Sequence, residues 1–316
     1  MRVVVVGSGI SGLSTALELI NAGYHVAVVS ADPIEVTTSF LAAAVWFPTA
    51  AAPVDRVNAW AATTFDYLEG LAVAGSPGVR MCESLALYRS DPPLPAWSQS
   101  VRGFRIARSD ELPPGYGHGY RFSVPLVEMP VFLPWLRDRI VALGARWIRR
   151  TVQKLGDVAD LRPDVVVNCA GLRAGELVGD STLFPIRGQI VRVTNPGLAL
   201  SVRDEAHPIG RAYVHPRAND CVLGGSLDVG NQDVTPDPEL TQSIVERCCD
   251  LVPQLADSSV IETLVGLRPG RKEVRLELDT ETTVGIPVVH NYGHGGSGVT
   301  IGYGCAREVV TAVGVL

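Results

Sequence analysis

RVVVVGSGISGLSTALELINAGYHVAVVSAD, from Arg2 to Asp32, is the stretch that decides the fold. The valine run from Arg2 to Val6 is typical of a strand buried on both faces of a parallel sheet. Three glycines follow in the spacing G-x-G-x-x-G, and the next apolar residues recur at helical spacing until Gly23, a residue type common at helix C-termini. The order of strand, glycine turn and helix predicts the opening unit of an α/β domain.

The same unit predicts a dinucleotide-binding site. Gly7 allows a tight turn, Gly9 lets a pyrophosphate approach the backbone, and Gly12 lets the helix pack on the strand. A second strand, Tyr24 to Ser30, leads to Asp32, 20 residues beyond Gly12, where an acid would meet a ribose hydroxyl. The motif does not separate FAD from NAD, but Asp32 disfavours a phosphorylated ribose.

Composition excludes several classes of protein. The chain has 316 residues, 47% hydrophobic and 19% charged, which is typical of a folded globular protein with a substantial core. A net charge of -6 argues against nucleic-acid binding, and no apolar run is long enough to span a membrane. The N-terminus does not read as a secretory signal, the C-terminal TAVGVL lacks the peroxisomal S-K-L, and the six cysteines form no CxxC pair. We therefore expect a cytoplasmic protein with reduced thiols.

The rest of the chain predicts a return to the first sheet and a second, antiparallel sheet. Val165 to Asn168 is another buried parallel-type strand, whereas PIRGQIVRV and AYVHPRANDCVLGGSL are typical of antiparallel strands and a hairpin. DPELTQSIVERCCDLVP predicts a helix that starts near Asp237. Near the C-terminus a strand leads through Gly293, Gly295, Gly296 and Gly298 into a helix. A second glycine loop of this kind is more typical of FAD enzymes than of two-domain NAD dehydrogenases.

The decapeptide GLRPGRKEVR, Gly266 to Arg275, gathers cations in an acidic chain. Arginine is mostly exposed, so a solvated surface strand is the simplest interpretation of Arg268, and an anchor for an anionic substrate is the alternative. We interpret Arg271 and Arg275 as structural cations. Arg211 and His215 flank Tyr213 at strand spacing, which predicts that they share its face and could add a cation to a pocket. No metal site is expected, because the histidines of the glycine loop have no adjacent carboxylate or thiol.

Several motifs together resemble those of the D-amino-acid oxidases. They are VVVVGSGISGLSTALEL, AAAVWFP, TFDYL, VVVNCAG, RGQIVRV, AYVHPR leading to LGGS, GLRPGRKEVRLE and VVHNYGHGGSGVTIGYGCAREV, and they cover nearly the whole chain. The fold implied is a discontinuous Rossmann-like FAD-binding domain of the glutathione-reductase type, joined to an α+β substrate domain on a mixed or antiparallel sheet. The resemblance implies an FAD-binding domain of residues 1–52, 129–184 and 271–316, with residues 53–128 and 185–270 forming the substrate domain.

The resemblance also implies roles for individual residues. Arg268 and Tyr213 would hold the substrate carboxylate, and the Gly296 carbonyl would accept a hydrogen bond from the substrate amine. No side chain would act as acid or base. The residues implied to contact FAD are Gly7, Ser8, Gly9, Ile10, Ser11, Gly12, Asp32, Thr37, Thr38, Ser39, Ala43, Ala44, Val45, Val152, Ala170, Gly295, Gly296, Ser297, Gly298, Val299 and Thr300.

Departures from the family pattern bear on the substrate. Ile209 stands where animal members carry a lid tyrosine, Phe47 replaces a glutamine, and Leu227 stands where D-aspartate oxidases have an arginine. The residues expected to line the pocket are Phe47, Ile209, Arg211 and Leu227. The substrates implied are neutral, apolar or branched D-amino acids. The reaction implied by the resemblance is hydride transfer from the substrate to flavin N5, with O2 as electron acceptor. The products are 2-oxo acids, ammonia and hydrogen peroxide.

Alternatives to this activity stay open. They are D-aspartate oxidation with Arg211 as a second carboxylate partner, glycine or sarcosine oxidation, and a redox-inert FAD-binding or NAD-binding module. The oligomeric state stays open too, a homodimer included.

Overall fold

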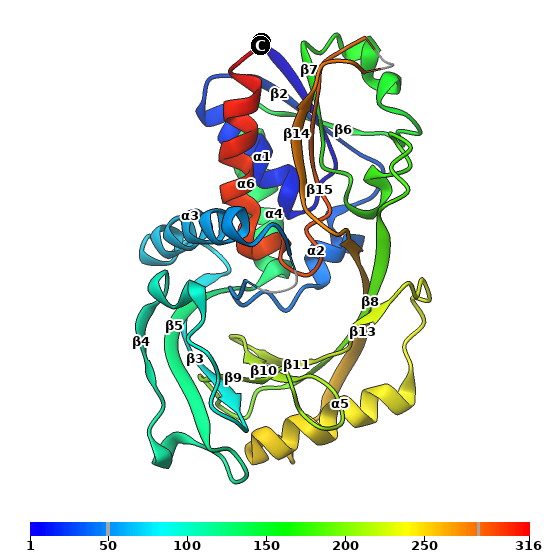
Figure 1. Cartoon of the computed structure of the whole chain (residues 1–316). Coiled ribbons are helices and arrows are strands. Elements are labelled where there is room, and N and C mark those ends of the chain that lie inside the picture. The colour runs from blue at the N-terminus through cyan, green and yellow to red at the C-terminus, as the bar shows by residue number, and fades with distance from the viewer. Residues whose placement is uncertain (49–50, 283–284) are drawn as a thin grey trace.

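The computed structural model describes residues 1–48, 51–282 and 285–316 and has an α/β fold with two sheets. One sheet lies at the top of Figure 1, where the chain also ends, and the other curves below it. Within the described residues, no helix has the length and apolar character needed to cross a membrane.

The six-stranded sheet is built around the first strand, as the valine run predicted. Its order is β14 (Arg275–Asp279), β15 (Val288–Tyr292), β7 (Val165–Asn168), β1 (Arg2–Val6), β2 (His25–Ser30) and β6 (Arg146–Arg149). β1 pairs in parallel with both β2 and β7, so Val3 lies beside Val26 on one side and Val165 on the other. Three separate stretches of the chain therefore supply this sheet.

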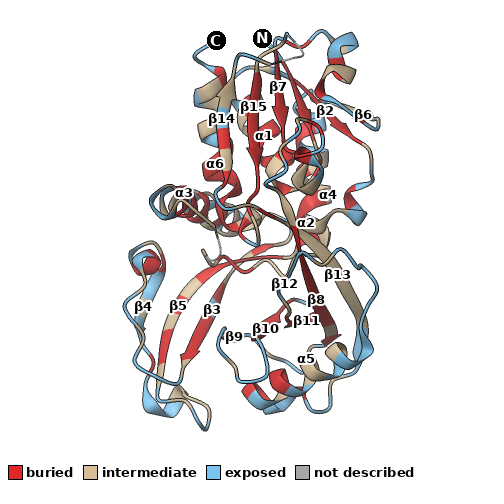
Figure 2. Cartoon of the chain, turned by 45° about the vertical axis from the view of Figure 1, so that its right-hand side comes forward, coloured by how far each residue is buried: buried red, intermediate tan, exposed pale blue. Residues whose placement is uncertain are grey.

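Both faces of β1 are buried because successive side chains point to opposite sides. Val3 and Val5 pack in a core with residues of α1 (Ile10–Asn21), α3 (Val54–Val73), α4 (Met129–Ala142) and α6 (Gly298–Val313). Val4 and Val6 pack on the other face against Leu155 and neighbouring side chains from the segment after β6. The strands at the centre of this sheet are accordingly buried in Figure 2.

The nine-stranded sheet is largely antiparallel. Its order is β12 (Asp228–Val229), β8 (Phe184–Thr194), β11 (Asp220–Gly224), β10 (Ala212–Pro216), β9 (Ser201–Asp204), β3 (Val79–Tyr88), β5 (His118–Val127) and β4 (Arg102–Ile106), with β13 (Val260–Gly270) also paired to β8. The predicted hairpin is formed by β10 and β11, in which Tyr213 lies opposite Gly224.

Helix α5 (Pro238–Leu251) covers one face of this sheet and begins next to Asp237, as predicted. The Asp237 carboxylate accepts hydrogen bonds from the amides of Glu239 and Leu240 at 2.9 and 3.1 Å. Val191, Val202 and Val214 pack with α5 in one core cluster. Because side chains alternate along a strand, Ile190, Arg203 and Tyr213 point to the opposite face. That face is turned towards the six-stranded sheet and the short helix α2 (Thr38–Leu41) (Figure 1).

Candidate active site

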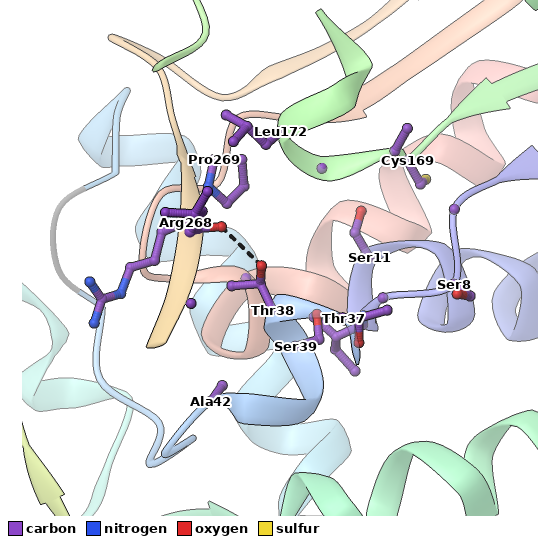
Figure 3. A pocket seen from close by; sticks show the side chains of 18 of the residues that line it. Ser8, Ser11, Thr37, Thr38, Ser39, Ala42, Cys169, Leu172, Arg268 and Pro269 are labelled. Carbon is purple, nitrogen blue, oxygen red and sulfur yellow. Dashed lines mark hydrogen bonds between the residues drawn. The ribbon is translucent and has the colours of Figure 1, made fainter. Parts of the chain in front are cut away.

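A cavity of about 370 Å3 lies between the two sheets. Its lining includes the glycine turn after β1, Asp32, α2, Tyr213 on β10 and Arg268 on β13. Figure 3 shows Ser8, Ser11, the residues of α2 and Arg268 around it. Thr38 Oγ1 donates a hydrogen bond of 2.9 Å to the carbonyl of Leu267, which ties α2 to the strand that bears Arg268. The cavity thus joins the predicted dinucleotide turn to the predicted carboxylate anchor.

The turn after β1 admits no side chain at two of its glycines. Gly7 has φ +116°, a conformation that favours glycine, and a Cβ there would lie 2.3 Å from the carbonyl oxygen of Cys169. A Cβ on Gly12 would lie 2.0 Å from the carbonyl oxygen of Gly7. Helix α1 begins at Ile10 with no acidic residue in its first turn, so its N-terminus faces the cavity without a competing anion.

The far end of the cavity is organised around Asp32. The hydroxyls of Ser8 and Ser30 lie 2.7 Å apart, and Ser30 Oγ donates to the carbonyl of Asp32 at 2.9 Å. These bonds fix the backbone that carries the Asp32 carboxylate, while Val152 lines the cavity beside it. The acid therefore sits at one end of the cavity, as the spacing predicted.

The C-terminal glycine loop forms another wall. Gly295, Gly296, Gly298 and Val299 line the cavity at the start of α6, and the amide of Gly295 donates to the carbonyl of Pro269 at 2.8 Å. His294 is buried beside them, and its Nε2 lies 2.9 Å from Asn291 Oδ1. Burial lowers the pKa of His294 to about 4, so this imidazole is neutral at physiological pH. The loop therefore presents backbone groups without adding a charge.

Arg268 and Tyr213 converge because each leans over a glycine of the neighbouring strand. A Cβ on Gly188 of β8 would lie 2.1 Å from Arg268 Nη1, and a Cβ on Gly224 of β11 would lie 2.3 Å from the Tyr213 hydroxyl oxygen. Gly296 approaches the Arg268 side chain from above, where a Cβ would lie 3.5 Å from its Cδ. The three groups named for substrate binding are thus brought to one end of the cavity.

Arg268 has no acidic partner among the described residues. Its one hydrogen bond there runs from Nη1 to the carbonyl of Ser226 at 3.1 Å. Arg271 and Arg275 differ, because both lie within 4 Å of the Asp180 carboxylate and are structural cations, as predicted. The half-buried Arg268 guanidinium is therefore available to an anion in the cavity.

Most of the residues predicted to contact the cofactor line this cavity. They are Gly7, Ser8, Gly9, Ile10, Ser11, Asp32, Thr37, Thr38, Ser39, Ala43, Val152, Ala170, Gly295, Gly296, Gly298 and Val299.

Five residues of that prediction do not line the cavity: Gly12, Ala44, Val45, Ser297 and Thr300. Gly12 lies behind the turn, against Gly7. Ala44 and Val45 run alongside β5, where the Ala44 carbonyl accepts from the amide of Val127 at 2.9 Å. Thr300 Oγ1 accepts from the amide of Phe47 at 3.2 Å, and the amide of Ser297 donates to the His294 carbonyl at 3.0 Å. These residues support the wall from behind.

The four residues expected to line the substrate pocket need correction. Arg211 precedes β10, pairs with Glu205 at 3.3 Å and does not line the cavity. Ile209 and Leu227 lie in connecting segments outside the cavity and are 55% and 38% exposed. Phe47 lies behind the cavity wall and packs against the rings of Trp97 and Phe122.

The sequence interpretation missed four residues on the sheet face that carries the site. Gly188, Ile190 and Leu264 form part of the cavity floor. Arg203 lies opposite Tyr213 in the neighbouring strand, on the same face, but does not itself line the cavity. Side chains alternate between the two faces along β8 and β9, and this alternation was visible in the sequence. Val191 and Val202 mark the face turned to α5, so the residues next to them face the cavity side. Without the strand register, that alternation did not say which face carries the site.

Comparison with known proteins accords with this geometry. The family model described as FAD dependent oxidoreductase, DAO, matches residues 2–312. The chain belongs to this family. It is 49% identical over 314 residues to a D-amino-acid oxidase of Rubrobacter xylanophilus, covering 99% of this chain and 96% of that protein. It is also 36% identical to the human D-aspartate oxidase over 327 residues, covering 99% and 94%.

Solved structures show the same fold at lower sequence identity. The glycine oxidase of Geobacillus kaustophilus superposes with a TM-score of 0.80 at 17% identity, covering 99% of this chain and 95% of that one. This likeness extends to both sheets, since nearly the whole chain is covered, and it concerns the fold alone.

Proposed function

We propose that this FAD-dependent oxidoreductase catalyses the oxidative deamination of D-amino acids to 2-oxo acids, with release of ammonia and hydrogen peroxide. The observation that carries the proposal is the Arg268 guanidinium, which faces the cavity next to Tyr213 and Gly296 without an acidic partner among the described residues. The two relatives compared above, named D-amino-acid oxidase and D-aspartate oxidase, support the same reaction class.

The substrate carboxylate would bind Arg268. A guanidinium presents two parallel N–H donors that match a carboxylate, and Tyr213 adds a hydroxyl donor from β10. Gly296, from the opposite wall, would accept a hydrogen bond from the substrate amine through its carbonyl oxygen. Clamping both groups fixes which face of the substrate Cα is presented, so positioning supplies much of the catalysis.

FAD is expected along the glycine turns at both ends of the chain. The turn at Gly7 and Gly12 excludes side chains, and the N-terminus of α1 has no acid in its first turn, so both suit a pyrophosphate. Asp32 would accept a hydrogen bond from a ribose hydroxyl. When bound, FAD supplies the acceptor for the hydride of the substrate Cα and passes the electrons to O2. We propose that residues 1–52, 129–184 and 271–316 form the FAD-binding domain and 53–128 and 185–270 the substrate domain.

We propose that no side chain acts as acid or base on the substrate. Asp32 lies at the cofactor end of the cavity, away from Arg268 and Tyr213. His294 is held neutral by burial and its Nε2 is engaged with Asn291. The amine proton would therefore be lost to solvent before hydride transfer.

Neutral, apolar D-amino acids are the first candidate substrates. Ile190 on β8 and Leu264 on β13 lie side by side in the sheet register and line the cavity. An apolar floor favours an aliphatic substrate side chain, because burying each methylene contributes about 0.8 kcal/mol. D-Leucine and D-valine are the test substrates for this candidate.

Acidic D-amino acids are a second candidate, favoured by Arg203. Arg203 is 4% exposed, lies opposite Tyr213, and makes no hydrogen bond or ion pair with another described residue. Its guanidinium carbon lies 3.9 Å from the centroid of the Phe47 ring. A buried guanidinium without an anion is costly, so a substrate carboxylate would stabilise it.

The nearest acids in sequence are engaged elsewhere. Asp204 points to the opposite face, where it accepts hydrogen bonds from Arg89, from the Tyr116 hydroxyl at 2.7 Å and from the Ala206 amide at 2.8 Å. Glu205 pairs with Arg211. This second candidate keeps the cation that the sequence suggested but moves it from Arg211 to Arg203.

The experiment is anaerobic mixing of the FAD-loaded protein with D-leucine, D-valine, D-aspartate and their L-enantiomers, followed through the flavin absorbance. Bleaching by D-forms and not by L-forms supports the proposed function, and no bleaching by any D-amino acid would overturn it. The ratio of kcat/KM for D-aspartate to D-leucine then ranks the two candidates. In an Arg203→Met variant this ratio should fall at least about tenfold if Arg203 binds the side-chain carboxylate, and stay unchanged if it does not.

A further inference from the structure

Arg247 is a buried cation whose partners are mainly backbone carbonyls. It lies on α5, is 2% exposed, and makes no ion pair with the described acidic residues. Its Nε donates to the carbonyl of Arg211 at 2.7 Å and its Nη2 to the carbonyl of Gly225 at 2.8 Å. Nη1 lies 3.4 Å from the carbonyl oxygen of Ile209 and donates to Ser243 Oγ at 3.1 Å. Burial lowers the pKa of Arg247.

The carbonyls that Arg247 binds belong to the two backbone segments on either side of Tyr213. Ile209 and Arg211 lie in the segment that enters β10, and Gly225 lies just after β11. The amide of Gly225 also donates to the carbonyl of Arg211 at 3.1 Å, so this one oxygen receives bonds from both Gly225 and Arg247. Arg247 therefore ties together two segments that adjoin one side chain.

Gly225 in turn lies against the hydroxyl group of Tyr213. A Cβ on Gly225 would lie 2.8 Å from the Tyr213 hydroxyl oxygen, and one on Gly224 would lie 2.4 Å or less from its ring carbons. The Tyr213 ring thus rests on the two glycines, and the position of Gly225 is fixed by Arg247. A shift of this backbone would move the hydroxyl relative to Arg268.

We propose that Arg247 is a positioning residue for substrate binding. It holds the segment 209–211 and Gly225 so that the Tyr213 hydroxyl meets the substrate carboxylate, although Arg247 itself lies behind the sheet and touches no substrate. This inference rests on the proposed function, since it takes Tyr213 as a carboxylate ligand.

The test is a double-mutant cycle on the FAD-loaded enzyme with its preferred D-amino acid. Arg247→Met keeps the apolar stem but removes every donor, and it should raise KM about tenfold while kcat changes little. Arg247→Lys retains a charged donor and should recover part of that loss. In a Tyr213→Phe background Arg247→Met should raise KM no further, because the hydroxyl that it positions is already gone.

A matched control is Arg217→Met. Arg217 is also buried and follows β10, but it pairs with Asp220 at the far end of the hairpin. This variant should lower the thermal unfolding midpoint without changing KM, which separates positioning from a general loss of stability.

The outcomes distinguish the inference from the proposed function. If Tyr213→Phe raises KM but Arg247→Met leaves it unchanged, or adds its full effect in the Tyr213→Phe background, Arg247 is not a positioning residue. If Tyr213→Phe leaves KM unchanged, the assignment of Tyr213 fails and the inference about Arg247 falls with it, whereas the proposed function keeps Arg268 as its carboxylate anchor. A lysine variant no better than methionine at equal unfolding midpoints also counts against the inference.

Discussion

The two ends of the cavity are built from different kinds of chemical group, backbone at one end and side chains at the other. At the Asp32 end the walls are largely backbone, since the glycine turn after β1 leaves no space for side chains at Gly7 and Gly12. At the Arg268 end the binding groups are side chains that converge from β13 and β10 over glycines of β8 and β11. One end offers N–H donors and a helix terminus, and the other offers an unpaired guanidinium and a hydroxyl.

This difference decides how each end responds to substitution. A backbone site fails when an added Cβ changes the path of the chain, and the ligand is then lost altogether. A side-chain site fails one group at a time, and the fold and the cofactor remain. Variants at the two ends should therefore be distinguished by whether FAD stays bound.

The largest effect is expected from Gly12→Ala. The new Cβ would lie 2.0 Å from the carbonyl oxygen of Gly7, a backbone atom that cannot move without displacing β1 or α1. We expect the variant to purify without FAD and to lose about 3 kcal/mol or more of stability, as overpacked sites do. Absorbance near the flavin bands and thermal unfolding measure the two effects. A yellow, stable Gly12→Ala protein would contradict the backbone account of this end.

Arg268→Met should have the next largest effect and leave FAD in place. Removing one partner of a desolvated charge pair costs about 2 to 5 kcal/mol, so KM for the D-amino acid should rise at least about 30-fold. Arg275→Met is the matched control from the same stretch, because Arg275 donates to the Glu277 carboxylate and the Tyr292 hydroxyl, both at 2.7 Å. The control should lower the unfolding midpoint with KM unchanged. Equal KM values for the two variants would remove Arg268 as the anchor.

Gly188→Ala tests whether the side-chain end also depends on backbone. Its Cβ would lie 2.1 to 2.3 Å from the Arg268 guanidinium, a flexible group that can swing aside. We expect FAD to stay bound and KM to rise about tenfold, because the Arg268 guanidinium is displaced without being removed. Gly266→Ala, on the residue directly opposite in β13, places its Cβ at ordinary contact distances of 3.5 and 3.8 Å and should change KM much less. Similar KM values for both alanine variants would show that Gly188 does not set the position of Arg268.

The two ends also differed in how far the sequence predicted them. Gly7, Gly12 and Asp32 belong to one local stretch, in which spacing along the chain corresponds to position in space: Gly7 and Asp32 line the cavity, and Gly12 lies behind the turn. Arg203 and Gly188 acquire their positions from the pairing of strands that are distant in sequence. Asp204 accepts a hydrogen bond from Arg89 and Glu205 pairs with Arg211, so neither acid pairs with Arg203. These pairings could not be predicted from the sequence, which is why Arg211 was predicted as the extra cation. Charge pairing across strands is a property of the register, which no local spacing reveals.

The smallest expected effect concerns pH and again separates the two regions. Burial, with a smaller contribution from Arg275, lowers the pKa of His290, on β15, to about 4, and burial lowers that of His294 to about 4. In the unfolded chain a histidine titrates near about 6.5, so between these values the unfolded state binds more protons than the folded state. Stability is therefore full above about pH 6.5 and falls as the pH drops towards 4.

At pH 5.5 the loss should be about 1 kcal/mol for each histidine, visible as a lower unfolding midpoint than at pH 7.5. His290→Gln and His294→Gln should each flatten this dependence and the double variant should flatten it further, while His215 and His207, whose pKa values burial also lowers, retain the remainder. KM for the D-amino acid in wild-type enzyme should not follow the same curve, because burial holds the pKa of His215, which stacks on the Tyr213 ring with centroids 4.5 Å apart, well below its ordinary value, and this imidazole stays neutral. A KM that rises in step with the falling midpoint would show that the glycine loop and the carboxylate site are coupled, and the division between the two ends would then be wrong.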